Sequence, residues 1–76
     1  MENQKTMILK HLQKFGAIDP MVALRDYGCM RLGARIWDLR HDGHNIKATT
    51  VHYKNKFGQA KHYSVYTLEE EKHESA

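Results

Sequence analysis

Two short helical segments follow each other so closely in the sequence that the chain must turn sharply between them. The first begins at Asp19 and Pro20, because aspartate is a good N-cap and proline fits the first position of a helix. It should end near Tyr27, since Gly28 can adopt the left-handed conformation that terminates helices. The helical pattern restarts within two residues and predicts a second helix over about residues 30–42. Two helices joined by a short, glycine-containing turn are typical of a helix-turn-helix, although other corners between helices share this spacing.

A further helix is predicted upstream, over residues 4–15, and Gly16 follows it where a C-terminal cap belongs. Lysines and glutamines separate its apolar positions, as in an amphipathic helix packed on a core. The side chains expected to face that core are Ile8, Leu9, Leu12 and Phe15.

The amino-acid composition changes after Asn45, where β-branched and aromatic residues accumulate in two runs, over residues 46–53 and 63–67. Residues 54–58 between them contain Asn55 and Gly58, which tolerate the positive φ of a reversal. A β-hairpin is therefore predicted. The inward-facing residues have even numbers before Thr49 and odd numbers after Thr50, so the strand must contain a bulge or a twist near these two residues.

These elements predict an α+β fold in which a three-helix helix-turn-helix core is followed by a two-stranded β-hairpin wing, a winged helix. A chain of 76 residues is too short for two cores, so residues 4–68 should form one domain. Residues 69–76 are acidic, lack apolar residues before the final alanine, and are expected to form a disordered tail.

Positive charge is concentrated in the second half of the predicted domain. The formal net charge is +3, and because the last eight residues carry −3, residues 1–68 carry +6. Seven lysines or arginines lie between Arg31 and Lys61 against only Asp38 and Asp42. Such a segment favours a polyanionic partner, although an ordinary solvated face would have the same composition.

Several other classes of protein lack support in the sequence. The single cysteine, Cys29, cannot form an internal disulfide and suits a reducing compartment, and no run resembles a signal peptide or a membrane span. We therefore expect a cytoplasmic protein without membrane contacts. His41 with His44, and His52 with His62 across the hairpin, invite a metal hypothesis, but cysteine or carboxylate partners are not spaced for it. No phosphate loop or catalytic arrangement is evident, so neither a cofactor nor an enzymatic activity is predicted.

The second helix of the helix-turn-helix is expected to place Leu32, Ile36 and Leu39 in the core. Arg31 is the best candidate for a base contact, because a guanidinium can bond guanine O6 and N7 together. Arg35 lies one turn later, but it can equally pair with Asp38 on the helix surface. Arg40 is assigned a structural role. The other residues expected on the exposed face or its rim are Ala34, Trp37, Asp38 and His41.

The predicted wing carries a second group of candidate DNA contacts: Lys54, Asn55, Lys56 and Lys61. Lysines at a hairpin tip can contact phosphates, which positions a protein on DNA without reading its sequence. The alternative is that these lysines protect an exposed strand edge from aggregation.

The run from Tyr27 to Ile46 resembles a family of small helix-turn-helix proteins of bacteriophages and prophages, whose hallmark is G-x-x-R-L-x-A-R-I-x-D-L-R-x-x-G-x-x-I. The positions that match it are Gly28, Arg31, Leu32, Ala34, Arg35, Ile36, Asp38, Leu39, Arg40, Gly43 and Ile46. The resemblance implies a winged helix-turn-helix that binds DNA, and it covers nearly all of residues 4–68.

The leading hypothesis is a sequence-specific module for double-stranded DNA that acts as a small phage or prophage transcriptional regulator or recombination directionality factor. A protein-binding module that engages a host transcription or defence protein through Met30, Trp37 and Phe57 is the alternative, and non-specific DNA coating is a third possibility. Both a monomer and a homodimer fit the sequence.

Overall fold

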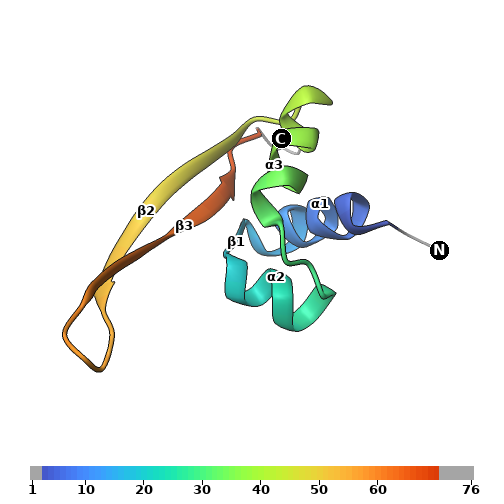
Figure 1. The fold of residues 1–76 in the computed structure, drawn as a ribbon. Coiled ribbons are helices and arrows are strands. Elements are labelled where there is room, and N and C mark those ends of the chain that lie inside the picture. The colour runs from blue at the N-terminus through green and yellow to red at the C-terminus, as the bar shows by residue number, and fades with distance from the viewer. Residues whose placement is uncertain (1–2, 71–76) are drawn as a thin grey trace.

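The computed structural model describes residues 3–70 and consists of three helices and a three-stranded antiparallel sheet (Figure 1). The elements are α1 (Gln4–Phe15), β1 (Ala17–Ile18), α2 (Pro20–Tyr27), α3 (Leu32–His41), β2 (Ile46–Lys54) and β3 (Ala60–Leu68). The predicted bounds of α1 and α2 are confirmed. Helix α3 is shorter than predicted, and β3 begins three residues earlier than its apolar run. No helix within residues 3–70 is long and apolar enough to cross a membrane.

Local signals in the sequence fix the ends of the first two helices. The Asn3 carboxamide oxygen accepts a hydrogen bond from the amide of Thr6, and Asp19 accepts one from the amide of Val22, both at 2.9 Å. Such N-caps satisfy amides that have no partner within the helix. Gly16 and Gly28 end α1 and α2 with φ of 90° and 65°, which glycine adopts without the cost of a Cβ clash.

One core joins all three helices to the base of the hairpin. It consists of Ile8, Leu12, Ile18, Ala23, Cys29, Leu32, Ile36, Leu39 and Ile46. The three predicted core positions of α3 are therefore confirmed. Phe15 was expected in this core, and that prediction is wrong: its side chain is 64% exposed. It is the last residue of α1, where the chain turns away, and its ring packs beside His11 instead.

The sheet contains a third strand that the sequence prediction missed. Ala17 and Ile18 pair with Thr67 and Tyr66 of β3, so the strand order is β1-β3-β2 rather than a two-stranded hairpin. The left-handed turn at Gly16 directs the chain along β3, and the Gly16 carbonyl accepts a bond from the amide of Leu68 at 3.0 Å. A strand of two residues is too short to show a periodic pattern, and only its tertiary pairing defines it.

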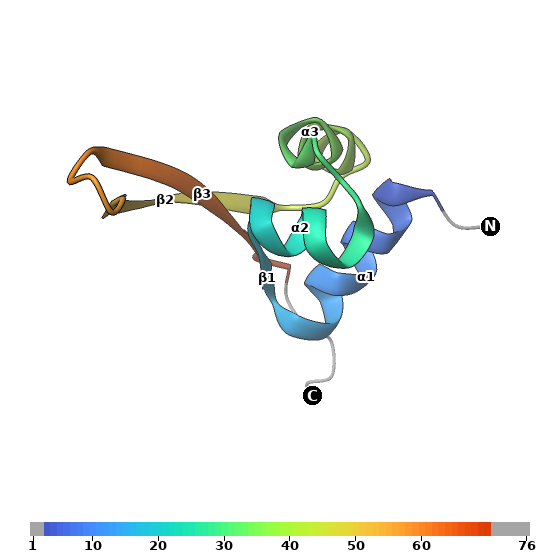
Figure 2. The same ribbon diagram turned by 60° about the horizontal axis from the view of Figure 1, so that its bottom comes forward.

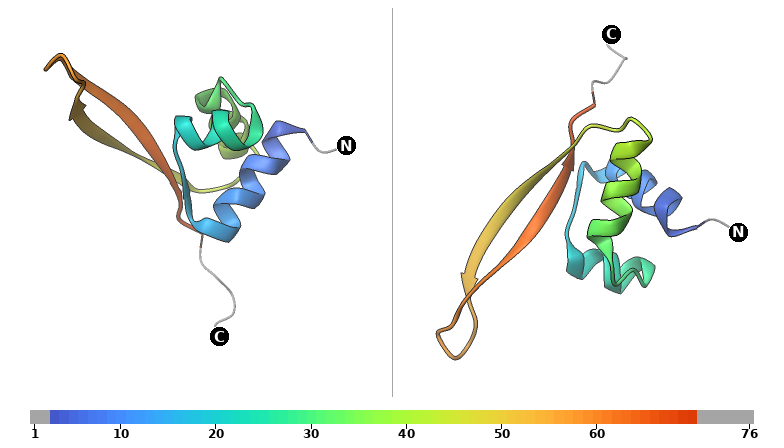
Figure 3. Two further views of the ribbon diagram at one scale, coloured as in Figure 1. Left: turned by 90° about the horizontal axis from the view of Figure 1, so that it is seen from below. Right: turned by 45° about the horizontal axis from the view of Figure 1, so that its top comes forward.

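The hairpin changes its inward face through twist alone. Its register runs without interruption from Ile46 opposite Leu68 to Lys54 opposite Ala60, so no bulge is present. Ile46 is nevertheless buried against the helices. Tyr53 points to the opposite face of the strand by its position in the sequence, yet it lines a groove together with residues of α2. The strands twist strongly along their length, and their outer half projects beyond the helices (Figures 2 and 3).

Candidate nucleic-acid interface

Arg31 lies immediately before α3 rather than inside it. It is the N-cap residue, and its carbonyl accepts bonds from the amides of Ala34 and Arg35 at 3.1 and 3.3 Å. The Arg31 side chain is exposed and makes no hydrogen bond or ion pair within residues 3–70. The backbone that carries it is therefore fixed by the helix, while its guanidinium is available to a partner.

The other two arginines of α3 take part in internal contacts. Nη2 of Arg35 lies 3.4 Å from a carboxylate oxygen of Asp38, and about a third of each side chain is exposed. Nε of Arg35 is buried and has no hydrogen-bond partner. Arg40 donates from Nε and Nη2 to the carbonyl of Ile46, at 3.0 and 2.9 Å, which confirms its structural role. These contacts connect α3 to itself and to the first residue of β2.

Trp37 and His41 form a stacked aromatic pair on the exposed side of α3. Their ring centroids are 3.6 Å apart, and Trp37 is 58% exposed. More than half of the tryptophan surface is therefore open to a partner. Ala34, three residues before Trp37, is half-buried.

The tip of the hairpin is a compact turn organised by Asn55. Its side-chain oxygen accepts bonds from the amides of Phe57 and Gln59 at 2.9 and 3.0 Å, and its side-chain nitrogen donates to Gln59 Oε1 at 2.8 Å. Gly58 completes the turn with φ of 78°. Asn55 was predicted as a DNA contact, but its polar atoms already bond within the turn, so it positions the tip.

Opposite charges near α3 are already paired, whereas the cations of the hairpin are not. Lys5 donates to Asp42 at 2.7 Å, and this hydrogen bond holds the pKa of Asp42 below its ordinary value. Asp38 is paired with Arg35. At the start of α3 and on the hairpin, the exposed cations that have no carboxylate partner within residues 3–70 are Arg31, Lys47, Lys54, Lys56 and Lys61. Lys14 on α1 is also exposed, and its ammonium lies 5.4 Å from the centroid of the Phe15 ring. Lys47 was not among the predicted contacts, because it lies inside a strand pattern rather than at the tip.

Two amides at the start of α2 already have hydrogen-bond partners and are not available to a phosphate. Asp19 accepts the amide of Val22 with its side chain and the amide of Ala23 with its carbonyl. The carboxylate is also negative, which disfavours an anion at this position.

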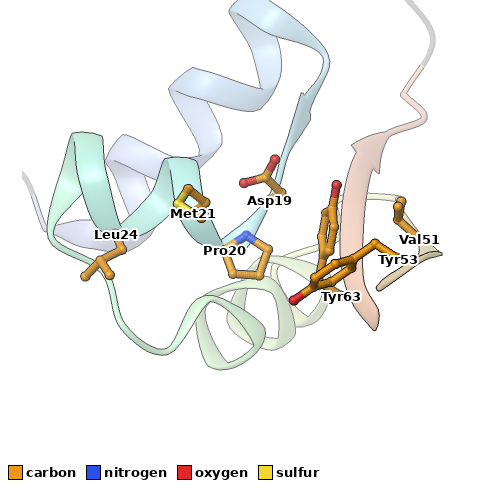
Figure 4. Close-up of a pocket in the computed structure, with 7 residues that line it drawn as sticks. All are labelled: Asp19, Pro20, Met21, Leu24, Val51, Tyr53 and Tyr63. Carbon is orange, nitrogen blue, oxygen red and sulfur yellow. The ribbon is translucent and has the colours of Figure 1, made fainter. Parts of the chain in front are cut away.

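An apolar groove of about 720 Å³ separates α2 from the hairpin (Figure 4). Met21 and Leu24 form one side and are 70% and 51% exposed, while Tyr53 and Tyr63 lie on the other with ring centroids 5.8 Å apart. The two tyrosine rings face α2 across this groove, and a gap remains between the two sides.

The histidines are distributed over separate contacts. His52 lies directly opposite His62, as predicted, with ring centroids 6.0 Å apart. His44 is hydrogen-bonded to Glu70 from the predicted tail, and the neighbouring Glu69 amide donates to the Asn45 carbonyl. Within residues 3–70, no three histidine, cysteine or acidic side chains are grouped so that they could hold a metal ion. The rest of the predicted disordered tail, residues 71–76, lies outside the described part of the chain.

The match to known protein families agrees with this geometry. The model of the winged helix-turn-helix domain family matches residues 3–71, and the chain therefore belongs to this family. Domains of this class are typically non-enzymatic and bind DNA. No significant match was found among curated proteins or among solved structures.

Proposed function

We propose that this protein is a sequence-specific binding module for double-stranded DNA. Helix α3 enters the major groove, with Arg31 contacting a base edge at its start and Ala34, Trp37 and His41 following along the exposed face. The hairpin lies on the flanking backbone, where Lys54, Lys56 and Lys61 contact phosphates and add affinity without sequence preference.

The observation that carries this proposal is the division between paired and unpaired charges. Asp38 and Asp42 are each neutralised by a cation at 3.4 and 2.7 Å, and no acidic residue occurs between Asp42 and Glu69. Five of the exposed cations that have no carboxylate partner within residues 3–70 therefore lie at the start of α3 and along the hairpin. This distribution suits a polyanion that contacts both elements at once.

A salt titration of duplex binding tests the proposal. Fluorescence anisotropy of a labelled duplex should show log affinity falling linearly with log salt concentration, with a slope set by the number of phosphates contacted. Lys14→Ala is a matched control, because Lys14 is an exposed cation on α1, and it should leave the slope unchanged. A slope near zero, or no binding to any duplex, would contradict the proposal.

We further propose that the module is a small phage or prophage regulator, acting on transcription or as a recombination directionality factor. Support comes from the resemblance of residues 27–46 to that family. The DNA sequence that the protein selects would show whether it binds as a monomer or as a homodimer. A palindromic pair of half-sites about one helical turn apart indicates a dimer.

The second candidate function is binding of a host transcription or defence protein by the same fold. Large exposed side chains in the turn before α3, on α3 and at the hairpin tip favour it, because Met30, Trp37 and Phe57 are 83%, 58% and 79% exposed. An apolar protein interface depends weakly on salt, so the titration above separates the two functions. Met30→Ala should weaken the protein complex and leave the salt slope of DNA binding unchanged.

A further inference from the structure

A large aromatic side chain lies at the extreme end of the hairpin, where no core can cover it. Phe57 is 79% exposed, and its ring contact within residues 3–70 is the Lys56 ammonium, 5.9 Å from the centroid. An exposed phenylalanine gives no stability to the folded chain and leaves apolar area in water. Its position leaves the ring open to a partner.

The turn that carries Phe57 is well ordered by its own hydrogen bonds. The Phe57 amide donates to the Asn55 side chain at 2.9 Å, and the backbone bonds Asn55 to Gln59 and Gly58 to Asn55 at 3.0 and 2.9 Å close the loop. A braced turn presents its side chain in a fixed direction, so little conformational entropy is lost when a partner covers it.

The charges around the tip select the class of partner. Lys54, Lys56 and Lys61 lie within four residues of Phe57 in the sequence, and the whole segment between Asp42 and Glu69 contains no acidic residue. A neutral apolar protein surface would have to desolvate these ammonium groups without compensation. A DNA duplex supplies both complements, since phosphates pair with the lysines and stacked bases accept an apolar ring between them.

We propose that Phe57 is a wedge that enters the minor groove beside the α3 site, partly unstacks one base step and bends the duplex. The hairpin extends to one side of α3 (Figure 2), and an element that passes the phosphate backbone bordering the major groove next reaches the minor groove. Apolar side chains inserted there kink DNA toward the major groove. This inference rests on the proposed DNA binding and adds a deformation of the target to it. Flexible pyrimidine–purine steps in the flank are then preferred, although no polar group reads them.

The test measures bending and unstacking on one duplex recovered by selection from a random pool. Fluorophores at its two ends report end-to-end distance by energy transfer, and 2-aminopurine at successive flanking positions reports loss of stacking. The wild-type protein should raise both signals. Phe57→Ala should abolish both and lower affinity about five- to tenfold, whereas Phe57→Leu, which retains an apolar wedge, should preserve them. Phe15→Ala, which removes an exposed phenylalanine from α1, is the matched control and should change neither signal.

Different outcomes would contradict the Phe57 wedge and DNA binding itself. If the wild-type protein binds the duplex without bending or unstacking it, or if Phe57→Ala bends it equally, the wedge is wrong while DNA binding stands. If no duplex is recovered at all, DNA binding itself fails. Sedimentation of the wild-type protein and of Phe57→Ala without DNA tests whether a second copy of the chain covers Phe57. If the wild-type protein self-associates and Phe57→Ala does not, the tip contacts another copy and the wedge proposal is wrong.

Discussion

Helix α3 and the hairpin are both basic, but they use their charges differently. In α3, Arg35 contacts Asp38 and Arg40 bonds the Ile46 carbonyl, so among its arginines only Arg31 at its start has no partner within residues 3–70. On the hairpin, the lysines at positions 47, 54, 56 and 61 are exposed and have no carboxylate partner within residues 3–70. Helix α3 thus has one available guanidinium at its start, whereas the projecting hairpin carries available ammonium groups on both of its faces.

This difference predicts a division of labour on DNA. Affinity from phosphate contacts should come mainly from the hairpin, and sequence discrimination mainly from the start of α3. Variants in the two regions should therefore differ in the kind of effect as well as in its size.

The largest effect is expected from removing the hairpin lysines together. A Lys54→Ala, Lys56→Ala, Lys61→Ala variant should lower duplex affinity about 100-fold or more at moderate salt and reduce the salt slope by about 2 to 3, because each phosphate contact releases counterions. Preference among sequences should be unchanged. Anisotropy titrations at several salt concentrations measure both quantities, and an unaltered slope would mean that these lysines only protect the strand edge.

Arg31→Ala should have the next largest effect, and of a different kind. Loss of a bidentate base contact costs about 1–3 kcal/mol against the preferred duplex and little against unrelated ones. Thermal stability should not change, since the side chain has no partner in the fold. Competition between preferred and scrambled duplexes measures the ratio of the two affinities. If this ratio were the same in the wild-type protein and in Arg31→Ala, the surface that reads the sequence would lie elsewhere.

Arg35→Ala should have a smaller effect on DNA affinity than Arg31→Ala, because its guanidinium faces Asp38. A double-mutant cycle of Arg35→Ala and Asp38→Ala in urea unfolding should give a coupling free energy of about 0.3–0.5 kcal/mol, as for other helix-surface pairs. If Arg35→Ala instead weakened the preferred duplex as much as Arg31→Ala, Arg35 would be a second reader.

The smallest effect concerns stability and pH. The hydrogen bond from Lys5 lowers the folded-state pKa of Asp42, so this pair stabilises the fold above the unfolded-state pKa, and the contribution is lost as the pH falls through the folded value. Asp42→Asn should therefore be slightly less stable than wild type at pH 7, and the difference should disappear at an acidic pH below the lowered folded-state pKa of Asp42. Urea unfolding at both pH values is the measurement, and a difference that persists in acid would assign the effect to another contact.

The sequence predicted elements whose signals are local and missed features that depend on tertiary contacts. The ends of α1 and α2 were correct because Gly16, Asp19 and Gly28 determine them through cap geometry. Strand β1 was missed because its two residues become a strand only by pairing with β3. Phe15 has the spacing of a core residue, but the chain turns away directly after it.

Site residues were predicted less completely for a related reason. A basic residue at the right spacing can either face a partner or pair within the fold, as Arg35 and Arg31 show. Asn55 was recognised as a turn residue, but only the geometry reveals that its side chain bonds both Phe57 and Gln59. Lys47 lies within a strand pattern and became a candidate only when its exposure and lack of a carboxylate partner were visible.

The central claim, that α3 reads sequence while the hairpin binds the backbone, is tested most directly by parallel selections from a random duplex pool. We predict that the wild-type protein and the triple lysine variant enrich the same motif, the latter at lower salt, whereas Arg31→Ala loses preference at one base pair of it. Enrichment of no motif by the wild-type protein, or of an identical motif by Arg31→Ala, would contradict the claim.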